Sequence, residues 1–349
     1  MARQRRPVLG AVLAVGIGLA ASGLAGVSAG AASGGGGSGT LRLGYFPNVT
    51  HAPALVGVQG GLFTQALGSN ATLKLFTFNA GPAAVEALLS NSIDASYVGP
   101  NPAINAFIQS SGAVRIIAGA ASGGAFLVVK PTVKTAADLK GKVLATPQLG
   151  NTQDVALRTY LAAHGLKTDI TGGGDVSVRP EDNATTLQAF QQNQIDGAWV
   201  PEPYATRLVN AGGKVLVDER SLWPQGRFVT TELVVRTDYL KAHPAVVKRL
   251  LQGQVAAVNL ITTNPARAQQ LVGQAIQSAT GSSLSAALIA SSFRSITFTN
   301  DPIATSLTVQ AQDAKKLGLL KSTKLTGLYD LTLLNQVLQA AHQPAVKAG

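Results

Sequence analysis

The 349-residue chain contains no cysteine, and this absence excludes several kinds of protein. Without a thiol there is no disulfide bridge, no cysteine nucleophile and no cysteine-ligated metal centre. Histidine is also scarce, and no pair of histidines shows the H-x-x-x-H spacing of a zinc site on a helix. We therefore expect neither a metal nor a cofactor. The histidines are His51, His164, His243 and His342.

Charged residues make up only 13% of the chain, and no stretch concentrates charge of one sign. The 28 Lys and Arg outnumber the 17 Asp and Glu, so the formal net charge is +11, which attracts anions. The basic residues neither form a block nor alternate with aromatic residues, so we expect no nucleic-acid binding. With 46% apolar residues, the chain is long enough to hold two core-forming domains.

Long apolar runs are missing everywhere except near the N-terminus. There, three arginines precede an apolar stretch over residues 8–27, and Ala29-Gly30-Ala31 follows. This order is typical of a secretory signal, so we expect an exported protein, periplasmic or at the cell surface. The signal peptide would cover 1–31 and a Gly/Ser-rich tether 32–40. Retention of the apolar segment as a membrane anchor is the alternative.

From residue 40 onward, short β-branched segments alternate with helical patterns, and this order begins again after residue 131. Such alternation predicts α/β lobes, each with a parallel sheet and helices on both faces. The first elements expected are a strand over 41–46 and one long helix over 52–67. The predicted domain order is lobe 1 over 41–124, a crossover over 125–130, lobe 2 over 131–227, a second crossover over 228–236 and a helical completion of lobe 1 over 237–349.

One pattern occurs twice, as NSIDASYVGPNP at 91–102 and as NQIDGAWVPEPY at 193–204. In each copy an Asn-x-Ile-Asp turn links a helix to a buried strand, and a loop with Pro-x-Pro follows the strand. The copies fall at equivalent places in the two predicted lobes. We therefore interpret them as equivalent cleft-forming units, one in each lobe.

The loops that follow the predicted strands each lead into the start of a helix. In open parallel sheets, ligands bind beyond the carboxyl ends of the strands. Helix starts present free backbone N–H groups and the positive end of the helix dipole, so they suit anions. Asn, Thr and Gln side chains in these loops add neutral donors. The loops cover 47–51, 79–82, 99–102, 148–153 and 201–204.

These loops also carry a family resemblance. The stretches GYFPNVTHAPAL, TFNAGPAAVEAL, IDASYVGPNP, ATPQLGNTQDVALR and GAWVPEPY resemble the solute-binding proteins of nitrate/sulfonate/taurine-type ABC importers. The resemblance extends over about residues 41–340. It implies an α/β, type II periplasmic binding protein fold, in which two doubly wound lobes are joined by two crossover segments and close by a hinge motion.

Within that family the sequence is most similar to the aliphatic-sulfonate branch. This similarity implies a binding protein that captures a small organic anion, an aliphatic sulfonate first of all, and delivers it to permease and ATPase subunits. We expect it to act as a monomer. Binding of taurine, nitrate or a thiamine pyrimidine precursor is the alternative, as is a non-transport sensory or adhesion module. Enzymes with related lobes use a cysteine that is absent here, so we do not expect an enzyme.

Carried over residue by residue, the resemblance implies ligand contacts from both lobes. For His51 the alternative is capping of the following helix, and for Trp199 it is burial in the core. For Asn151 and Thr152 the alternative is an N-cap role alone. The implied ligand-binding residues are Tyr45, Asn48, His51, Gly81, Asn101, Gly150, Asn151, Thr152, Gln153, Trp199 and Glu202.

Glu202 is the hardest of these residues to reconcile with an anionic ligand, because a desolvated carboxylate repels an anion. Capping of the following helix is the default interpretation, and a basic partner or a ligand ammonium are the alternatives. We expect neutral donors to hold the anion, while Arg158 lies exposed farther along its helix and is screened by solvent.

One feature departs from the family pattern. Many relatives carry a lipobox that ends in cysteine, whereas the corresponding string here is Leu19-Ala20-Ala21-Ser22-Gly23. A serine cannot accept the thioether lipid, so we expect the exported protein to lack a lipid anchor.

Overall fold

The computed structural model describes residues 39–348, and all of them belong to one compact unit. The expected signal peptide, most of the tether and Ser22 lie outside the described residues. Within residues 39–348, no helix combines the length and the apolar character that crossing a bilayer requires. The same range holds no cluster of His, Asp and Glu side chains able to bind a metal ion.

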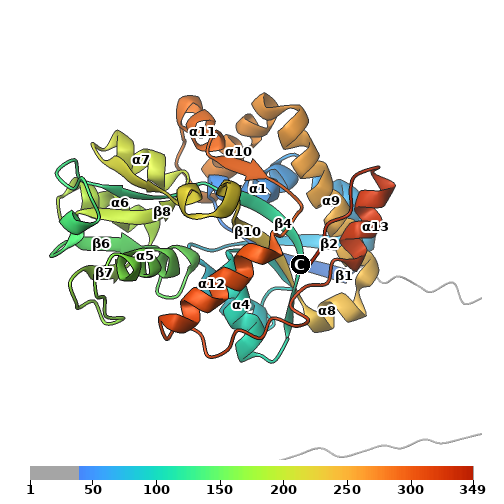
Figure 1. The fold of residues 1–349 in the computed structure, drawn as a ribbon. Helices are drawn as coiled ribbons and strands as arrows, with labels where there is room; N and C mark the ends of the chain where they lie inside the picture. The colour runs from blue at the N-terminus through green and yellow to red at the C-terminus, as the bar shows by residue number, and fades with distance from the viewer. Residues whose placement is uncertain (1–38, 349) are drawn as a thin grey trace, which may run out of the picture. The chain divides into compact units, whose positions relative to one another are not determined.

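Lobe 1 is built on a six-stranded sheet (Figure 1). In sheet order its strands are β11 (Ile296–Phe298), β4 (Val114–Gly123), β10 (Val229–Arg236), β3 (Ala95–Val98), β1 (Gly39–Tyr45) and β2 (Ala71–Thr77). Its helices are α1 (Ala52–Gln59), α2 (Leu62–Leu67), α3 (Gly81–Leu89), α4 (Pro100–Gln109), α8 (Thr237–Ala242), α9 (Pro244–Thr263), α10 (Pro265–Thr280), α11 (Ala286–Phe293), α12 (Ala304–Lys316) and α13 (Thr332–Ala340).

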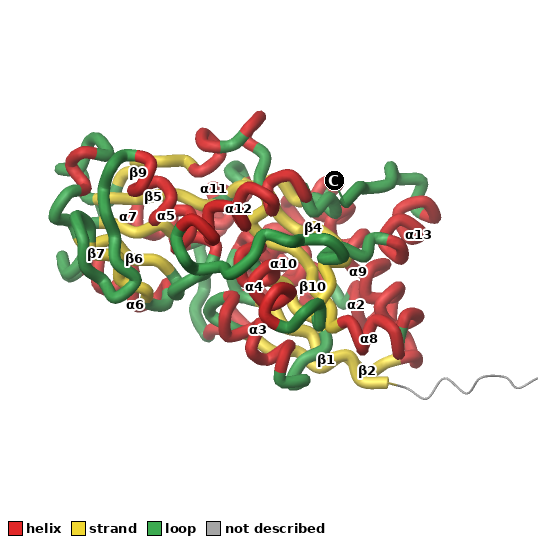
Figure 2. The backbone as a smooth tube through the Cα atoms, turned by 60° about the horizontal axis from the view of Figure 1, so that its bottom comes forward, coloured by secondary structure: helices red, strands yellow, loops and turns green. Residues whose placement is uncertain are grey.

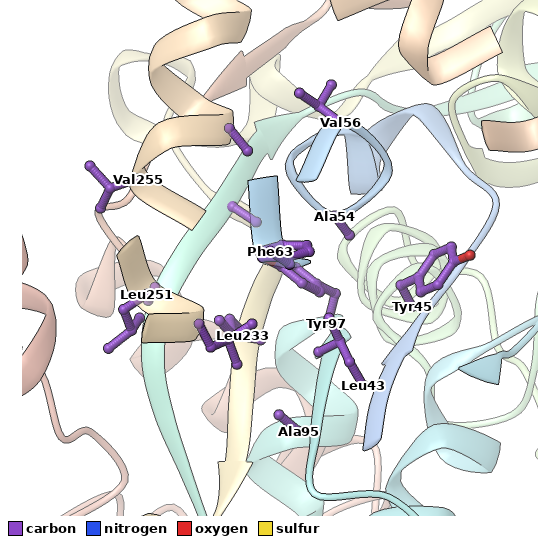
Figure 3. Close-up of a cluster of buried hydrophobic side chains, with 14 of the residues drawn as sticks. Leu43, Tyr45, Ala54, Val56, Phe63, Ala95, Tyr97, Leu233, Leu251 and Val255 are labelled. Atoms are coloured by element: carbon purple, nitrogen blue, oxygen red, sulfur yellow. The ribbon is translucent and has the colours of Figure 1, made fainter. Parts of the chain in front are cut away.

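Apolar clusters cover both faces of this sheet. One cluster packs the sheet against α1, α2, α9 and α10, and the other packs it against α3, α4 and α12. Figure 2 shows β1 and β10 with α2, α8 and α9 on one side and α3 and α4 on the other. Figure 3 shows part of the first cluster, where the rings of Phe63 and Tyr97 lie 6.4 Å apart between centroids.

Lobe 2 is built on a five-stranded sheet, also with apolar clusters on both faces. In sheet order its strands are β7 (Ser177–Pro180), β6 (Val143–Thr146), β8 (Gly197–Pro201), β5 (Ala125–Val129) and β9 (Lys214–Asp218). Its helices are α5 (Thr152–Ala163), α6 (Asn183–Gln191) and α7 (Tyr204–Asn210).

The sheets are mixed, so the prediction of wholly parallel sheets is wrong. β1 runs parallel to β2 and β3, and β6 runs parallel to β7 and β8. The strands that enter from the other lobe, β5 and β10, run antiparallel to their neighbours. The reason is direction of entry: β5 and β10 begin where the lobes meet, whereas the parallel strands end there.

Both copies of the repeated pattern begin with an asparagine in the left-handed region. Asn91 has φ 61° and Asn193 has φ 58°, and each follows the last turn of a helix, α3 or α6. The next residue of each copy donates its N–H back to the helix, from Ser92 to Ala87 and from Gln194 to Ala189. This is the hydrogen-bond pattern of a Schellman cap, for which Asn is the usual substitute for Gly.

The aspartate of each copy forms hydrogen bonds to the backbone of the strand beside it. Asp94 accepts from the backbone N–H of Arg42 on β1 at 2.8 Å, and Asp196 accepts from that of Val143 on β6 at 2.9 Å. The backbone N–H of each aspartate donates to the carbonyl of the same partner, at 2.9 and 2.8 Å. Each copy of the repeat therefore has the same structural role. It ends a helix, fixes two central strands in register and places the following loop between the lobes.

The predicted helix over 52–67 is interrupted. α1 ends at Gln59 and α2 begins at Leu62, with Gly60 and Gly61 between them. Gly61 adopts φ 70°, which is available to glycine without the strain that a side chain would bring. The break lets α2 turn its own apolar side, including Phe63, into the core.

Candidate ligand-binding site

A small cavity lies between the lobes, beyond the carboxyl ends of the parallel strands of both sheets. Its volume is about 30 Å³, and His51 is the one residue of its described lining with a side chain that titrates near neutral pH in water. Lobe 1 contributes Phe46, Asn48, Thr50, His51, Asn79, Ala80, Gly81, Gly99, Pro102, Thr230 and Thr231, and lobe 2 contributes Pro147, Asn151, Thr152, Gln153, Asn183 and Pro201.

Four helices begin at this cavity. α3 begins with Gly81, and Gly99 is the N-cap of α4; neither helix has a side-chain cap. In lobe 2, α5 begins with Thr152 and α6 with Asn183. The first N–H groups of a helix have no partner within it, and the helix dipole is positive there. The start of α6 is capped by the carboxylate of Asp182, whereas α3, α4 and α5 have no charged capping side chain. The positive ends of these three helices suit a ligand with a single negative charge.

Three polar side-chain atoms of the lining are buried without a hydrogen-bond partner. They are the hydroxyl oxygens of Thr152 and Thr231 and the amide oxygen of Asn183. A buried polar group without a partner destabilises a protein by about 1–3 kcal/mol, so such atoms in one cavity indicate a binding role. They come from both lobes, since Thr231 lies on β10 and the other two residues start helices of lobe 2.

Asn151 and Gln153 have different roles at the start of α5. The side-chain oxygen of Asn151 accepts from the N–H of Asp154 at 2.8 Å, which is an N-cap hydrogen bond. Its amide group donates to the side-chain oxygen of Gln153 at 3.2 Å. Asn151 therefore caps α5 and also lines the cavity, so its contact with a ligand stays a prediction. Thr152 takes no part in the cap, and the amide nitrogen of Gln153 stays available as a donor.

His51 is a neutral donor in this cavity. Its ring is buried and stacks on Phe46 with 4.3 Å between centroids. Burial lowers the pKa of His51 to about 3, so the imidazole is uncharged at neutral pH. Its Nδ1 accepts from the backbone N–H of Phe46 at 3.3 Å, so the proton of the neutral ring is on Nε2. His51 makes no side-chain hydrogen bond to the start of α1, so the capping alternative is wrong.

Comparison with known proteins identifies the family. A model of the NMT1-like family matches residues 34–276. The chain belongs to the NMT1-like family. It is 30% identical over 230 residues to a protein of Brucella abortus that carries the name of a binding protein, which covers 64% of this chain and 68% of that one. It is 31% identical over 203 residues to the taurine-binding periplasmic protein of Escherichia coli, which covers 58% of this chain and 61% of the relative.

Solved structures confirm the predicted fold of this NMT1-like protein. The alkanesulfonate-binding protein of Xanthomonas axonopodis pv. citri, bound to MOPS, matches with a TM-score of 0.67 at 21% identity. The match covers 81% of this chain and 95% of that structure. The fold is thus the two-lobed α/β fold of periplasmic binding proteins.

The NMT1-like chain brings together about half of the residues that the resemblance assigned to the ligand. Those that line the cavity are Asn48, His51, Gly81, Asn151, Thr152 and Gln153. Their contact with a ligand stays a prediction. Those that do not line it are Tyr45, Asn101, Gly150, Trp199 and Glu202.

Trp199 does not face the cavity, so the prediction that it is exposed in the cleft is wrong. The indole is fully buried in the apolar cluster of lobe 2, and its Nε1–H donates to Glu219 at 2.7 Å. Burial raises the pKa of Glu219 to about 7. The alternative interpretation, a core residue, is the correct one. All five residues of β8 are buried, so alternation along this strand could not separate a core face from an exposed one.

Glu202 does not line the cavity, and capping is the correct interpretation of its carboxylate. Its oxygens accept from the backbone N–H of Thr206 at 3.1 Å and from the hydroxyl of Thr206 at 2.8 Å, within the first turn of α7. A further hydrogen bond crosses between the lobes, from the hydroxyl of Ser292 on α11 at 3.1 Å. Burial raises the pKa of Glu202, and these hydrogen bonds oppose the shift.

Three other predicted residues serve the structure around the site. Tyr45 lies on the same face of β1 as Leu43 and belongs to the lobe 1 core (Figure 3). The side-chain amide of Asn101 donates to the carbonyl of Gln310 on α12 at 3.3 Å. Gly150 adopts φ 73°, and its N–H donates to Asp154 at 2.9 Å.

Arg158 is not exposed, contrary to the prediction. Its side chain is 1% exposed and pairs with Asp154 at 3.1 Å, one turn back along α5. A second donor of the guanidinium reaches the carbonyl of Asp169 at 2.9 Å. Asp154 also accepts from Thr146 at 3.0 Å, so the ion pair anchors the start of α5 to the end of β6.

Asn183 and Thr231 line the cavity but were not among the predicted residues. Asn183 starts α6, which follows the strand β7, so the rule that selected the other loops applies to it as well. Thr231 follows Thr230 in the second crossover, FVTTELVVR, whose other residues are apolar apart from Glu232 and Arg236. A pair of hydroxyl residues in such a strand was the available signal.

Proposed function

We propose that this protein is the extracytoplasmic binding component of an ABC importer and that its ligand is an aliphatic sulfonate. The observation that carries the proposal is the set of buried, neutral groups without partners around one small cavity, contributed by both lobes. The relatives support the class of protein, because one is a taurine-binding periplasmic protein and another is an alkanesulfonate-binding protein bound to MOPS, itself a sulfonate.

The chemistry of the lining favours a sulfonate head group. A sulfonate carries one negative charge on three oxygens and has no proton to donate at neutral pH. The hydroxyls of Thr152 and Thr231, the Nε2–H of His51 and the N–H groups of the helix starts are donors, so they match these oxygens. A phosphate dianion would leave a further charge to compensate, and no cation is among the described residues of the lining.

The size of the cavity favours a head group over a whole ligand. At about 30 Å³ it has roughly two to three times the space that one water molecule needs. The position of Glu202 argues against taurine as the preferred ligand. That carboxylate was the candidate partner for the taurine ammonium, yet it is bound to Thr206 and Ser292 and is not part of the lining.

Ligand binding is tested by thermal shift and titration calorimetry with ethanesulfonate, taurine, sulfate, nitrate and a thiamine pyrimidine precursor. We expect ethanesulfonate to stabilise the protein by about 2.7 kcal/mol at a hundredfold excess over its Kd, without turnover. Stabilisation by nitrate or by the pyrimidine alone would contradict the ligand assignment. Conversion of any ligand to a product would contradict the assignment to a binding protein.

A transport role is tested in the native host by deleting the gene and supplying an alkanesulfonate as the sole sulfur source. We expect growth to be lost and to return when the gene is restored, while growth on sulfate is unaffected. A protein that binds sulfonates while the deletion strain grows normally would support a sensory module instead.

A further inference from the structure

A second and larger cavity lies directly outside the first. Its volume is about 580 Å³, and it shares Asn48, Asn79 and Asn183 with the lining of the inner cavity. We call it the vestibule. Its walls come from α6 and α7 of lobe 2 and from the end of α10 and the following loop of lobe 1. The vestibule is therefore the space next to the inner cavity in which the far end of a ligand would lie.

The vestibule contains charge, unlike the inner cavity. Its charged lining residues are Arg207 and Asp182. The Asp182 carboxylate is occupied as the N-cap of α6, because it accepts from the N–H groups of Ala184 and Thr185 at 3.0 Å each. A third hydrogen bond comes from the hydroxyl of Thr185 at 3.0 Å. Three donors and the positive helix end offset the negative charge of Asp182.

Arg207 is the charge left for a ligand. Its guanidinium lies over the ring of Tyr204, 5.0 Å from the centroid, and both side chains are half-buried. Arg207 forms no ion pair with any residue between 39 and 348, whereas Arg158 and Arg179 of the same lobe each pair with a carboxylate. A guanidinium has five N–H donors and binds carboxylates with two parallel hydrogen bonds.

We propose that the vestibule binds the far end of the ligand and that this end is acidic, so that the preferred ligand class is an aliphatic sulfonate with a terminal carboxylate. The inference rests on the proposed function, because it takes the sulfonate head in the inner cavity as given. The head is then held by neutral donors and the tail by Arg207, with the Tyr204 hydroxyl as a further donor. Such a division gives the site selectivity through the tail while the head contacts stay the same.

The test compares ligands that differ only at the tail. Titration calorimetry is run on unsubstituted alkanesulfonates and on the matching ω-carboxylated sulfonates, for chains of two to five carbons. We expect the carboxylated member to bind roughly fivefold tighter at the chain length that reaches Arg207, the size of effect that a partly exposed ion pair gives. In Arg207→Gln this advantage is lost, while the unsubstituted sulfonates bind as they do to the wild type.

Arg267→Gln is the matched control, because it removes the same charge from the exposed start of α10. Residue 267 is about 20 Å along the helix from Thr280, which lines the vestibule. We expect the carboxylate advantage to survive in this variant. If the advantage is absent at every chain length, or unchanged in Arg207→Gln, the vestibule proposal is wrong while the proposed function stands. If Arg207→Gln weakens both ligand series equally, Arg207 is not a tail contact and the proposal is also wrong. If no sulfonate binds the wild type, it is the proposed function that fails.

Discussion

A substitution of Thr152 tests whether the anion is bound by neutral donors or by a cation. Its hydroxyl is buried, without a partner, and lines the cavity. We expect Thr152→Val, which keeps the shape and removes the donor, to weaken sulfonate binding roughly ten- to a hundredfold. The reason is that a hydrogen bond to a charged partner contributes about 1.5–3 kcal/mol. Titration calorimetry measures the change.

Thr159 supplies the control for this substitution. Its hydroxyl is also buried without a partner on α5, but it does not line the cavity. Thr159→Val should leave the Kd unchanged, and Thr152→Ser should keep most of the affinity. Wild-type affinity in Thr152→Val would rule out the hydroxyl as a ligand contact.

The sequence suggested that Arg158 is an exposed charge of little consequence, whereas the structure predicts that its loss destabilises the protein. Because Arg158 and Asp154 are both at most 1% exposed, removing one partner leaves a buried charge without compensation. We expect Arg158→Gln to lower the free energy of unfolding by about 3–5 kcal/mol, as measured in urea. Binding would weaken as a consequence, because Asp154 positions Gly150 and Thr146 beside the start of α5. An unfolding free energy equal to that of the wild type would show that the pair is not structural.

Glu219 makes the stability of the protein depend on pH. Burial is the main cause that raises its pKa from 4.5 to about 7, and the hydrogen bonds from the indoles of Trp199 and Trp223 oppose it. The folded protein therefore holds this proton over a pH range in which the unfolded chain has lost it. Stability from this group is fully present below pH 4.5 and is lost as the pH rises to about 7. The loss is on the order of 3 kcal/mol.

Glu219→Gln tests this dependence, because the amide is neutral at every pH. Urea unfolding at pH 4.5, 6 and 8 should show the variant gaining stability relative to the wild type as the pH rises. A difference that stays constant across the three pH values would mean that Glu219 does not titrate in this range.

At the scale of elements, the alternation of strands and helices could be read from the sequence because its signals are local. The sequence predicts helices over 204–210 and 244–263, and α7 and α9 have these bounds, since helix starts and ends are marked by Pro, Asn and the apolar period. The directions of β5 and β10 could not be read, because a strand carries no sequence mark of the side from which it joins a sheet. The break after α1 could not be read either, because it depends on the positive φ of Gly61, which the apolar period of the sequence does not show.

For the candidate site, the sequence predicted the loops better than the side chains. Helix starts after strands identified Asn48, Gly81 and the Asn151–Gln153 segment, because position follows from topology alone. The direction in which a side chain points could not be predicted in this way, because it depends on contacts with distant parts of the chain. Asn101 lies in the first turn of α4 and Glu202 in the loop before α7, yet the side chain of each bonds to a helix from a distant part of the chain.

The Glu202–Ser292 hydrogen bond joins α11 of lobe 1 to the loop before α7 of lobe 2. We expect this contact to hold the lobes together around the ligand. Ser292→Ala should weaken sulfonate binding about tenfold, because the buried carboxylate loses one of its donors. Titration calorimetry on Ser295→Ala is the control, since the Ser295 hydroxyl donates to the carbonyl of Ser292 within the same lobe. Equal affinity of Ser292→Ala and the wild type would show that the contact does not contribute to closure.

At the scale of the whole described unit, the two copies of the repeat make equivalent contacts across the cavity. The loop after β3 brings Gly99 so close to Thr152 that a Cβ on the glycine would lie 2.3 Å from the threonine hydroxyl oxygen. The loop after β8 brings the carbonyl of Glu202 to the N–H of Val49, at 3.1 Å. In each case the loop of one lobe meets the segment that follows the central parallel strand of the other, β6 or β1. These two contacts explain why the same pattern occurs in both lobes.

The chain passes from lobe 1 to lobe 2 at Gly123 and Gly124, and we expect the lobes to close about this point and the return segment between β9 and β10. Both glycines adopt positive φ, 82° and 73°. Small-angle scattering should therefore give a smaller radius of gyration with a saturating sulfonate than without it. Hinges of this kind are a few residues at the ends of elements that absorb the backbone rotation.

Gly124→Ala tests the hinge directly. A Cβ on Gly124 would lie 2.4 Å from Ile296 and 3.2 Å from Thr50, both in lobe 1, so it would push the lobes apart. Gly141→Ala is the matched control, because its φ of 74° brings the same backbone strain but no atom lies within 4 Å of the added Cβ. We expect both variants to lose about 1–2 kcal/mol of stability from that strain. Only Gly124→Ala should keep the larger radius in the presence of ligand and bind it more weakly, and an identical response of the two variants would place the hinge elsewhere.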